Sequence, residues 1–165
     1  VNNRQKHRVF EKISAHYGGK LNGKTIALWG LSFKPRTDDM REAPSRVLME
    51  SLWEAGAKVK AYDPEAMGET QRLYPDQNGL ELCETAHDAL DGADALAIIT
   101  EWQEFRSPDF ATLKDSLADA VIFDGRNLYE PEIVAHFGLR YHAIGRGHDT
   151  MAGSTYGRRK EDKVS

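Results

Sequence analysis

Cationic side chains gather in a loop that directly follows the first apolar segment of the sequence. Residues 30–41 read GLSFKPRTDDMR and carry Lys34, Arg36 and Arg41. A helix is expected to begin at Pro44, and the amino terminus of a helix favours anions through its dipole and its free N–H groups. The loop therefore favours an anionic ligand, and the alternative is that its charges are solvated surface.

Another cation, Arg126, follows a second apolar segment in the sequence FDGRN at 123–127. Because ligands of parallel sheets bind outside the carboxyl ends of the strands, we expect Arg126 and Lys34 to converge there from separate loops. Asp124 and Gly125 are typical of a tight turn, so we interpret the Asp124 carboxylate as a group that orients neighbouring backbone.

An acid and an aromatic residue complete the candidate edge of the sheet. Asp63 follows an expected strand, where dinucleotide-binding folds place a ribose-binding acid, but Asp63-Pro64 also forms a turn and helix cap, which we favour. Trp102 could stack on a flat ring or pack with Phe105 over the sheet edge, and we favour packing. Gly30 is a single glycine where the dinucleotide fingerprint needs three, so that fingerprint is absent.

Other catalytic chemistries find little support in the sequence. Cys83 is the single cysteine and stands among the acids Glu81 and Glu84. Acidic neighbours raise the pKa of a thiol, so we interpret Cys83 as structural. No G-x-S-x-G or P-loop motif occurs. The histidines do not show the spacing of a metal site, so none is predicted; they are His7, His16, His87, His136, His142 and His148.

The elements that position these residues alternate between strand and helix. Short apolar runs predict strands, and apolar residues spaced by three or four predict helices. Such alternation implies a parallel sheet with helices on both faces, a Rossmann-like doubly wound α/β fold. The expected strands are 24–29, 58–62, 80–83, 93–100, 120–123 and 140–144, and the expected helices are 3–17, 44–55, 65–73, 85–90, 109–117 and 132–137.

The expected strand order decides where a ligand binds. With the order 3-2-1-4-5-6, the switch point of the sheet lies between the first and fourth strands. The loops 30–41, 101–108 and 124–131 then lie next to the switch point.

The composition is that of one ordinary domain. The chain has 165 residues, of which 40% are hydrophobic and 29% charged, with a formal net charge of −4. This charge argues against a nucleic-acid partner. No apolar run approaches the roughly 20 residues of a membrane span, and charged residues occur throughout 1–20. We therefore expect no membrane association, no signal peptide and a cytoplasmic setting.

Four sequence segments, in the right order, resemble one known family. They are GLSFKPRTDDMREAPS at 30–45, YDPEA at 62–66, ITEWQEF at 99–105 and FDGRNLY at 123–129. Together they resemble the C-terminal UDP-binding domain of the UDP-glucose/GDP-mannose dehydrogenase family. Two stretches, MREAPS at 40–45 and TEWQEF at 100–105, are more similar to its UDP-glucose branch than to its GDP-mannose or UDP-N-acetylhexosamine branches.

The resemblance implies roles for particular residues. In this family an N-terminal domain binds NAD, a long central helix dimerises the enzyme, and the C-terminal domain holds the UDP part of the substrate. Phe33, Lys34 and Arg126 would contact the substrate, and Arg41 would reach NAD across the domain cleft. The family's catalytic cysteine has no match here. The resemblance therefore implies no catalytic residue in this chain and no dehydrogenase activity of the chain alone.

Three acids stand close to these cations in the sequence. They are Asp38, Asp39 and Glu42. We expect them to cap the next helix or to orient Arg41, rather than to act as acids or bases.

The resemblance also divides the chain. Residues 1–19 resemble the end of the linking helix and 20–145 the UDP-sugar-binding domain, while 146–165 are expected to be a mobile polar tail. The chain opens within an expected helix, so we expect a longer parent protein. Such a parent would form a homodimer or higher homo-oligomer and oxidise UDP-glucose to UDP-glucuronate with two NAD. The alternative from another class is a stand-alone nucleotide-binding module.

Overall fold

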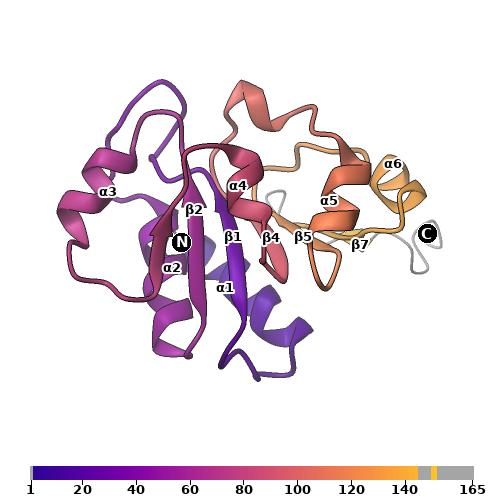
Figure 1. Ribbon diagram of the computed structural model, residues 1–165, viewed down its shortest axis with the longest axis horizontal. Helices are drawn as coiled ribbons and strands as arrows, with labels where there is room; N and C mark the ends of the chain where they lie inside the picture. Colours follow the sequence, from indigo (N-terminus) through magenta and orange to yellow (C-terminus); the bar gives the residue numbers. More distant parts are fainter. Residues whose placement is uncertain (1, 145–149, 152–165) are drawn as a thin grey trace.

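Six parallel strands and one short antiparallel strand form a twisted sheet in the computed structural model, which describes residues 2–144 and 150–151 (Figure 1). The strands are β1 (Thr25–Trp29), β2 (Lys58–Tyr62), β3 (Leu80–Leu82), β4 (Ala95–Ile98), β5 (Val121–Asp124), β6 (Arg140–Ala143) and β7 (Thr150–Met151). The helices are α1 (Asn2–His16), α2 (Pro44–Glu54), α3 (Met67–Leu73), α4 (Ala86–Leu90), α5 (Phe110–Ser116) and α6 (Pro131–His136), and a 3-10 turn, η1, spans Gln103–Phe105.

The strand order is β3-β2-β1-β4-β5-β6-β7, with parallel pairing up to β6. This order confirms the expected 3-2-1-4-5-6 arrangement and the doubly wound α/β fold. The antiparallel β7 pairs with β6, and the sequence does not predict it because two residues carry no periodic signal. Apart from these two residues, the expected mobile tail at 146–165 lies outside the described residues.

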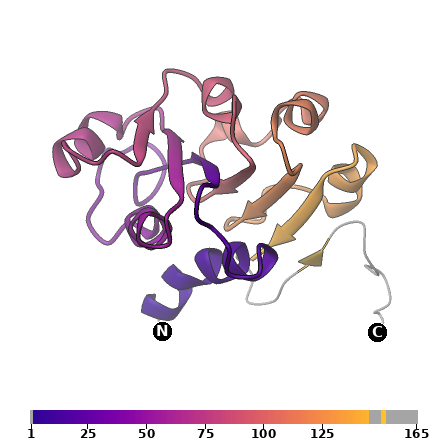
Figure 2. The same ribbon diagram turned by 60° about the horizontal axis from the view of Figure 1, so that its bottom comes forward.

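Burial on both faces explains why continuous apolar runs form the central strands. All residues of β4 and β5 are buried, as in parallel strands that helices cover on each side. One apolar cluster joins Ile13 of α1 and Leu48 of α2 to Ile26 of β1. The other joins Leu113 of α5 to Leu96 of β4. Figure 2 shows α1 and α2 below the sheet and α4 and α5 above it.

Helix α1 is packed into this fold. Val9 and Ile13 are buried in the same cluster as residues of the sheet. The Tyr17 hydroxyl, just after α1, donates a hydrogen bond of 2.7 Å to the Asp119 carboxylate, just before β5. The expected boundary between 1–19 and 20–145 stays a prediction. Within the described part of the chain, no helix is long and apolar enough to cross a membrane.

Candidate functional site

The loops after β1 and β4 approach each other closely at the switch point. Gly30 has a φ of +99°, and a Cβ added there would lie 2.5 Å from the Thr100 backbone nitrogen. The Thr100 hydroxyl donates a hydrogen bond of 2.8 Å to the Ser32 carbonyl. Glycine is therefore needed at position 30 for loop-to-loop contact as well as for its backbone conformation.

Asp63, at the end of β2, holds several backbone segments together. Its buried carboxylate accepts through Oδ2 from the backbone N–H groups of Leu31 at 2.7 Å and Ser32 at 3.1 Å. Its Oδ1 accepts from the N–H groups of Glu65 and Ala66, both at 2.8 Å. Both oxygens are thus committed to backbone, which confirms the turn interpretation and argues against ribose binding. The helix-cap part of the interpretation is wrong, because Ala66 is at the cap position of α3 and forms no side-chain cap.

Trp102 also belongs to this network. Its indole N–H donates to Asp63 Oδ2 at 3.1 Å, and its side chain packs at the edge of the apolar cluster that contains Phe105. The packing interpretation of Trp102 is therefore confirmed.

Asp124, the last residue of β5, shapes the loop that carries Arg126. Its carboxylate accepts from the backbone N–H of Arg126 at 2.8 Å, from that of Leu128 at 2.7 Å and from the Tyr141 hydroxyl at 2.6 Å. Burial raises the pKa of Asp124, while the hydrogen bonds from Tyr141 and the loop backbone oppose that rise. The structure confirms that Asp124 orients neighbouring backbone.

Arg126 forms a bidentate ion pair with Glu101 from the loop after β4. The distances are 2.9 Å from Nε to Oε1 and 3.1 Å from Nη2 to Oε2. The Arg126 side chain remains 46% exposed and that of Glu101 29%. A guanidinium has five N–H donors, so three of those on Arg126 stay available for a ligand after this pairing.

The loop after β1 presents the other expected site residues to solvent. Phe33 is 50% exposed and Lys34 is also exposed. Arg41 pairs with Asp39, whose two carboxylate oxygens lie 3.1 Å from Nε and 3.1 Å from Nη2 of Arg41, and its side chain is 88% exposed. The expectation that Asp39 orients Arg41 is confirmed.

Helix capping is the other role expected for the acids of this loop. The cap position of α2 is Ala43, which forms no side-chain cap hydrogen bond, so none of Asp38, Asp39 and Glu42 occupies that position. The side chain of Ala43 has no oxygen that could accept from the N–H groups of the first turn, which explains the missing cap.

The structure brings Phe33, Lys34 and Arg126 to one edge of the sheet, on loops separated by β4. Their roles, and that of Arg41, stay predictions. Sequence reasoning missed Glu101 as the partner of Arg126. The register pairs Ile98 with Asp124, so opposite charges just beyond these two strands were the available signal.

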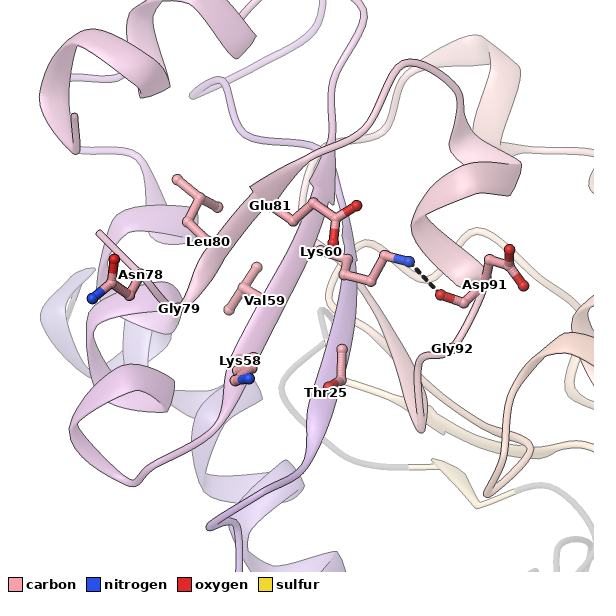
Figure 3. A pocket seen from close by; sticks show the side chains of 10 residues that line it. All are labelled: Thr25, Lys58, Val59, Lys60, Asn78, Gly79, Leu80, Glu81, Asp91 and Gly92. Atoms are coloured by element: carbon pink, nitrogen blue, oxygen red, sulfur yellow. Dashed lines mark hydrogen bonds between the residues drawn. The ribbon is translucent and has the colours of Figure 1, made fainter. Parts of the chain in front are cut away.

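A hollow of about 280 Å³ lies at the other end of the strands (Figure 3). Thr25 and Lys58, the first residues of β1 and β2, line it together with Lys60 and Asp91, and Lys60 Nζ donates a hydrogen bond to the Asp91 carbonyl. Ligands of doubly wound sheets bind outside the carboxyl ends of the strands. This hollow is therefore separate from the candidate site.

The residues of the β1 loop do not fit NAD in the mode of a dinucleotide fold. Gly30 is packed against Thr100, and both oxygens of Asp63 accept backbone hydrogen bonds.

Cys83 and the possible metal ligands that the structure describes offer no other catalytic chemistry. Burial is the main cause that raises the pKa of the Cys83 thiol, and the charge of Glu81 adds to it. A thiolate nucleophile needs a lowered pKa instead. Among the described residues, no group of three or more His, Cys, Asp or Glu side chains could hold a metal ion.

The fold and this site define a doubly wound α/β domain with cationic side chains at the carboxyl ends of its strands. Residues 27–131 match the UDP binding domain of the UDP-glucose/GDP-mannose dehydrogenase family. The chain belongs to this family, which confirms the resemblance seen in its motifs.

Curated relatives match most of the chain. It is 45% identical over 148 residues to a UDP-glucose 6-dehydrogenase of Pseudomonas aeruginosa, covering 88% of the chain and 33% of the relative. It is 43% identical over 146 residues to a UDP-glucose 6-dehydrogenase of Rhizobium meliloti, with the same coverage of 88% and 33%. The chain therefore spans about a third of the length of these relatives.

Solved structures of similar proteins share the fold. A UDP-glucose dehydrogenase from Pyrobaculum islandicum superposes with a TM-score of 0.67 at 28% identity, covering 78% of this chain and 27% of that one. An NDP-N-acetyl-D-galactosaminuronic acid dehydrogenase from Methanosarcina mazei gives a TM-score of 0.68 at 27% identity, covering 86% and 28%.

Proposed function

We propose that this chain binds the UDP part of a sugar nucleotide, as the C-terminal domain of a UDP-glucose 6-dehydrogenase. The observation that carries the proposal is Arg126, held by Glu101 at the same edge of the sheet as the loop with the exposed Phe33 and Lys34. The identity of 45% to a UDP-glucose 6-dehydrogenase supports the choice of ligand.

Each residue of the site contributes a different interaction. Lys34 supplies a positive charge for the diphosphate, and Phe33 supplies an exposed ring for the nucleotide. Arg126 donates its remaining N–H groups to oxygens of the ligand. Asp63 and Asp124 bind backbone in this scheme and do not touch the ligand.

The reaction of the whole enzyme oxidises the C6 alcohol of the sugar to a carboxylate, with two NAD accepting two hydrides and water supplying the second oxygen. NAD supplies the hydride acceptor. In this scheme the present chain holds and orients the sugar nucleotide and contributes no nucleophile, because Cys83 is buried and its thiol pKa is raised. The chain alone is therefore proposed to be inactive, and the whole enzyme to be a homo-oligomer in the cytoplasm.

Calorimetric titration of the chain with UDP tests the proposal. We expect measurable binding that Arg126→Ala weakens by about ten- to a hundredfold, the effect of losing charge-assisted hydrogen bonds. Arg106→Ala is a matched control, because Arg106 is an exposed arginine in the loop after β4. Equal UDP affinity of the Arg126→Ala variant and the parent would show that the site is wrong. Production of NADH from UDP-glucose by the chain alone would contradict its inactivity.

The identity of the nucleotide is tested in the same experiment. GDP should bind more weakly than UDP if the chain belongs to the UDP-glucose branch. Tighter binding of GDP would favour the GDP-mannose branch instead.

A further inference from the structure

Three consecutive residues after β4 each contact a different loop of the candidate site. The Thr100 hydroxyl bonds to the Ser32 carbonyl in the loop after β1, and the Trp102 indole bonds to Asp63 after β2. Between them, Glu101 pairs with Arg126 in the loop after β5. We propose that Glu101 is a positioning residue that holds the Arg126 guanidinium in its ligand-binding orientation; this inference rests on the proposed function.

The geometry of the pair leaves Arg126 able to bind a second group. Nη2 of Arg126 donates a hydrogen bond of 3.1 Å to Oε2 of Glu101, and Nε lies 2.9 Å from Oε1 in the ion pair. Both N–H groups of Nη1 and the second N–H of Nη2 remain. A guanidinium that a carboxylate contacts at two of its nitrogens keeps its plane fixed, so the remaining donors also point in fixed directions.

The backbones on both sides of the pair are fixed as well. On one side, the Arg126 N–H donates to the Asp124 carboxylate at 2.8 Å, and the Gly125 N–H donates to the Ile98 carbonyl at 2.9 Å. On the other side, Glu101 stands between two anchored residues, Thr100 and Trp102. Exposed ion pairs generally contribute little, but bidentate geometry between rigid segments is the exception. Here the ion pair orders the Arg126 side chain before the ligand binds, so less conformational entropy is lost on binding.

Two functions of Glu101 predict effects of opposite sign. A positioning residue strengthens binding, so its removal weakens the affinity for the ligand. A residue that merely occupies Arg126 in the free protein must be displaced, so its removal increases the affinity. We infer positioning because three donors stay available while the pair is intact, and the ligand therefore does not need to break it.

A double-mutant cycle, measured by calorimetric titration of the full 165-residue chain with UDP-glucose, tests this inference. Glu101→Ala should weaken binding about fivefold, and Glu101→Gln, which keeps one acceptor, should weaken it less. Adding Glu101→Ala to Arg126→Ala should cause no further loss, because Glu101 acts through Arg126. Glu104→Gln is the matched control, since this acid of the same loop bonds to the Tyr62 hydroxyl.

A spectroscopic signature separates positioning from a general structural effect. The guanidinium N–H resonances of Arg126 should exchange with water more slowly in the parent than in both Glu101 variants, with no change in Glu104→Gln. Tighter binding after Glu101→Ala, or additive losses in the double variant, would overturn the inference while leaving the proposed site intact. An Arg126→Ala variant that binds as well as the parent would instead overturn the proposed function.

Discussion

The indole N–H of Trp102 donates to Asp63 Oδ2 across 3.1 Å, which ties the loop after β4 to the end of β2. The same oxygen accepts the backbone N–H groups of Leu31 and Ser32, immediately before Phe33 and Lys34. One buried carboxylate therefore sets the position of two loops of the candidate site. Disturbing this contact should affect both stability and ligand affinity.

Trp102→Phe should lower the free energy of unfolding by about 1 kcal/mol, because it removes one hydrogen bond and keeps an aromatic ring. It should also weaken UDP binding, since the β4 loop loses a link to Asp63. Trp53→Phe is a matched control: the Trp53 indole donates to the Gly79 carbonyl at 2.9 Å, away from the site. Denaturant unfolding and UDP titration of both variants check this. Equal affinity losses in the two variants would contradict a specific role for Trp102.

Gly30→Ala should prevent the chain from folding or cost more than about 3 kcal/mol of stability, because the new methyl group would clash with backbone. A methyl carbon at position 30 would lie 2.5 Å from the Thr100 nitrogen. Gly92→Ala measures the cost of a positive φ without a clash. Gly92 has a φ of +79°, and nothing lies within 4 Å of an added Cβ. That variant should lose only about 1 to 2 kcal/mol. Similar losses in the two variants, measured by thermal unfolding, would show that the Thr100 contact matters little.

The topology and the edge of the candidate site follow from local patterns in the sequence. Apolar runs such as the one ending at Trp29, separated by amphipathic helices, define a βα alternation that has few possible arrangements. The same logic places Lys34 and Arg126 at one edge.

The detailed contacts do not follow from local patterns, because they join residues that are far apart in the chain. Glu101 meets Arg126, and Trp102 meets Asp63, only once the strand register is set. Gly30 illustrates the same point. A glycine after the first strand suggests a phosphate-binding turn by position, but here its lack of a side chain admits Thr100. Local sequence does not distinguish these two reasons for a glycine.

His142 should make stability depend on pH. Burial, followed by His16, Lys12 and Arg140, lowers the pKa of His142 to about 4. The folded state then keeps His142 neutral while the unfolded chain takes up a proton at about 6.5. The contribution of His142 to the free energy of unfolding is therefore complete above about pH 6.5. It decreases as the pH falls toward 4, by up to about 3 kcal/mol.

Comparison with His142→Phe isolates this contribution. The phenyl ring can keep the stacking on Phe123, whose ring centroid lies 4.8 Å from that of His142. The comparison matters because the raised pKa of Asp124 acts in the opposite direction. The stability difference between parent and variant should change between pH 6.5 and 4. A constant difference across this range would contradict the prediction.

Arg41→Ala should leave both stability and UDP affinity unchanged, because its side chain is 88% exposed and its ion pair with Asp39 joins residues of one loop. In a dehydrogenase that contains this chain, it should raise the KM for NAD. Steady-state kinetics with NAD and with UDP-glucose as the varied substrate separate the two effects. A rise in the KM for UDP-glucose alone would assign Arg41 to the sugar-nucleotide site instead.

Arg126→Lys should recover only part of the UDP affinity that Arg126→Ala loses. Lysine keeps the positive charge, but its ammonium is a point donor and cannot bind Glu101 through two parallel hydrogen bonds while offering a fixed set of donors to a ligand. The affinity should therefore lie between those of the parent and the Ala variant, and the remaining dependence on Glu101 should shrink. At Lys34, where the proposed interaction is with charge alone, Lys34→Arg should keep most of the affinity. Full recovery by Arg126→Lys in the same titration would contradict this prediction. It would mean that the ligand recognises the positive charge at this position and not the planar guanidinium that Glu101 orients.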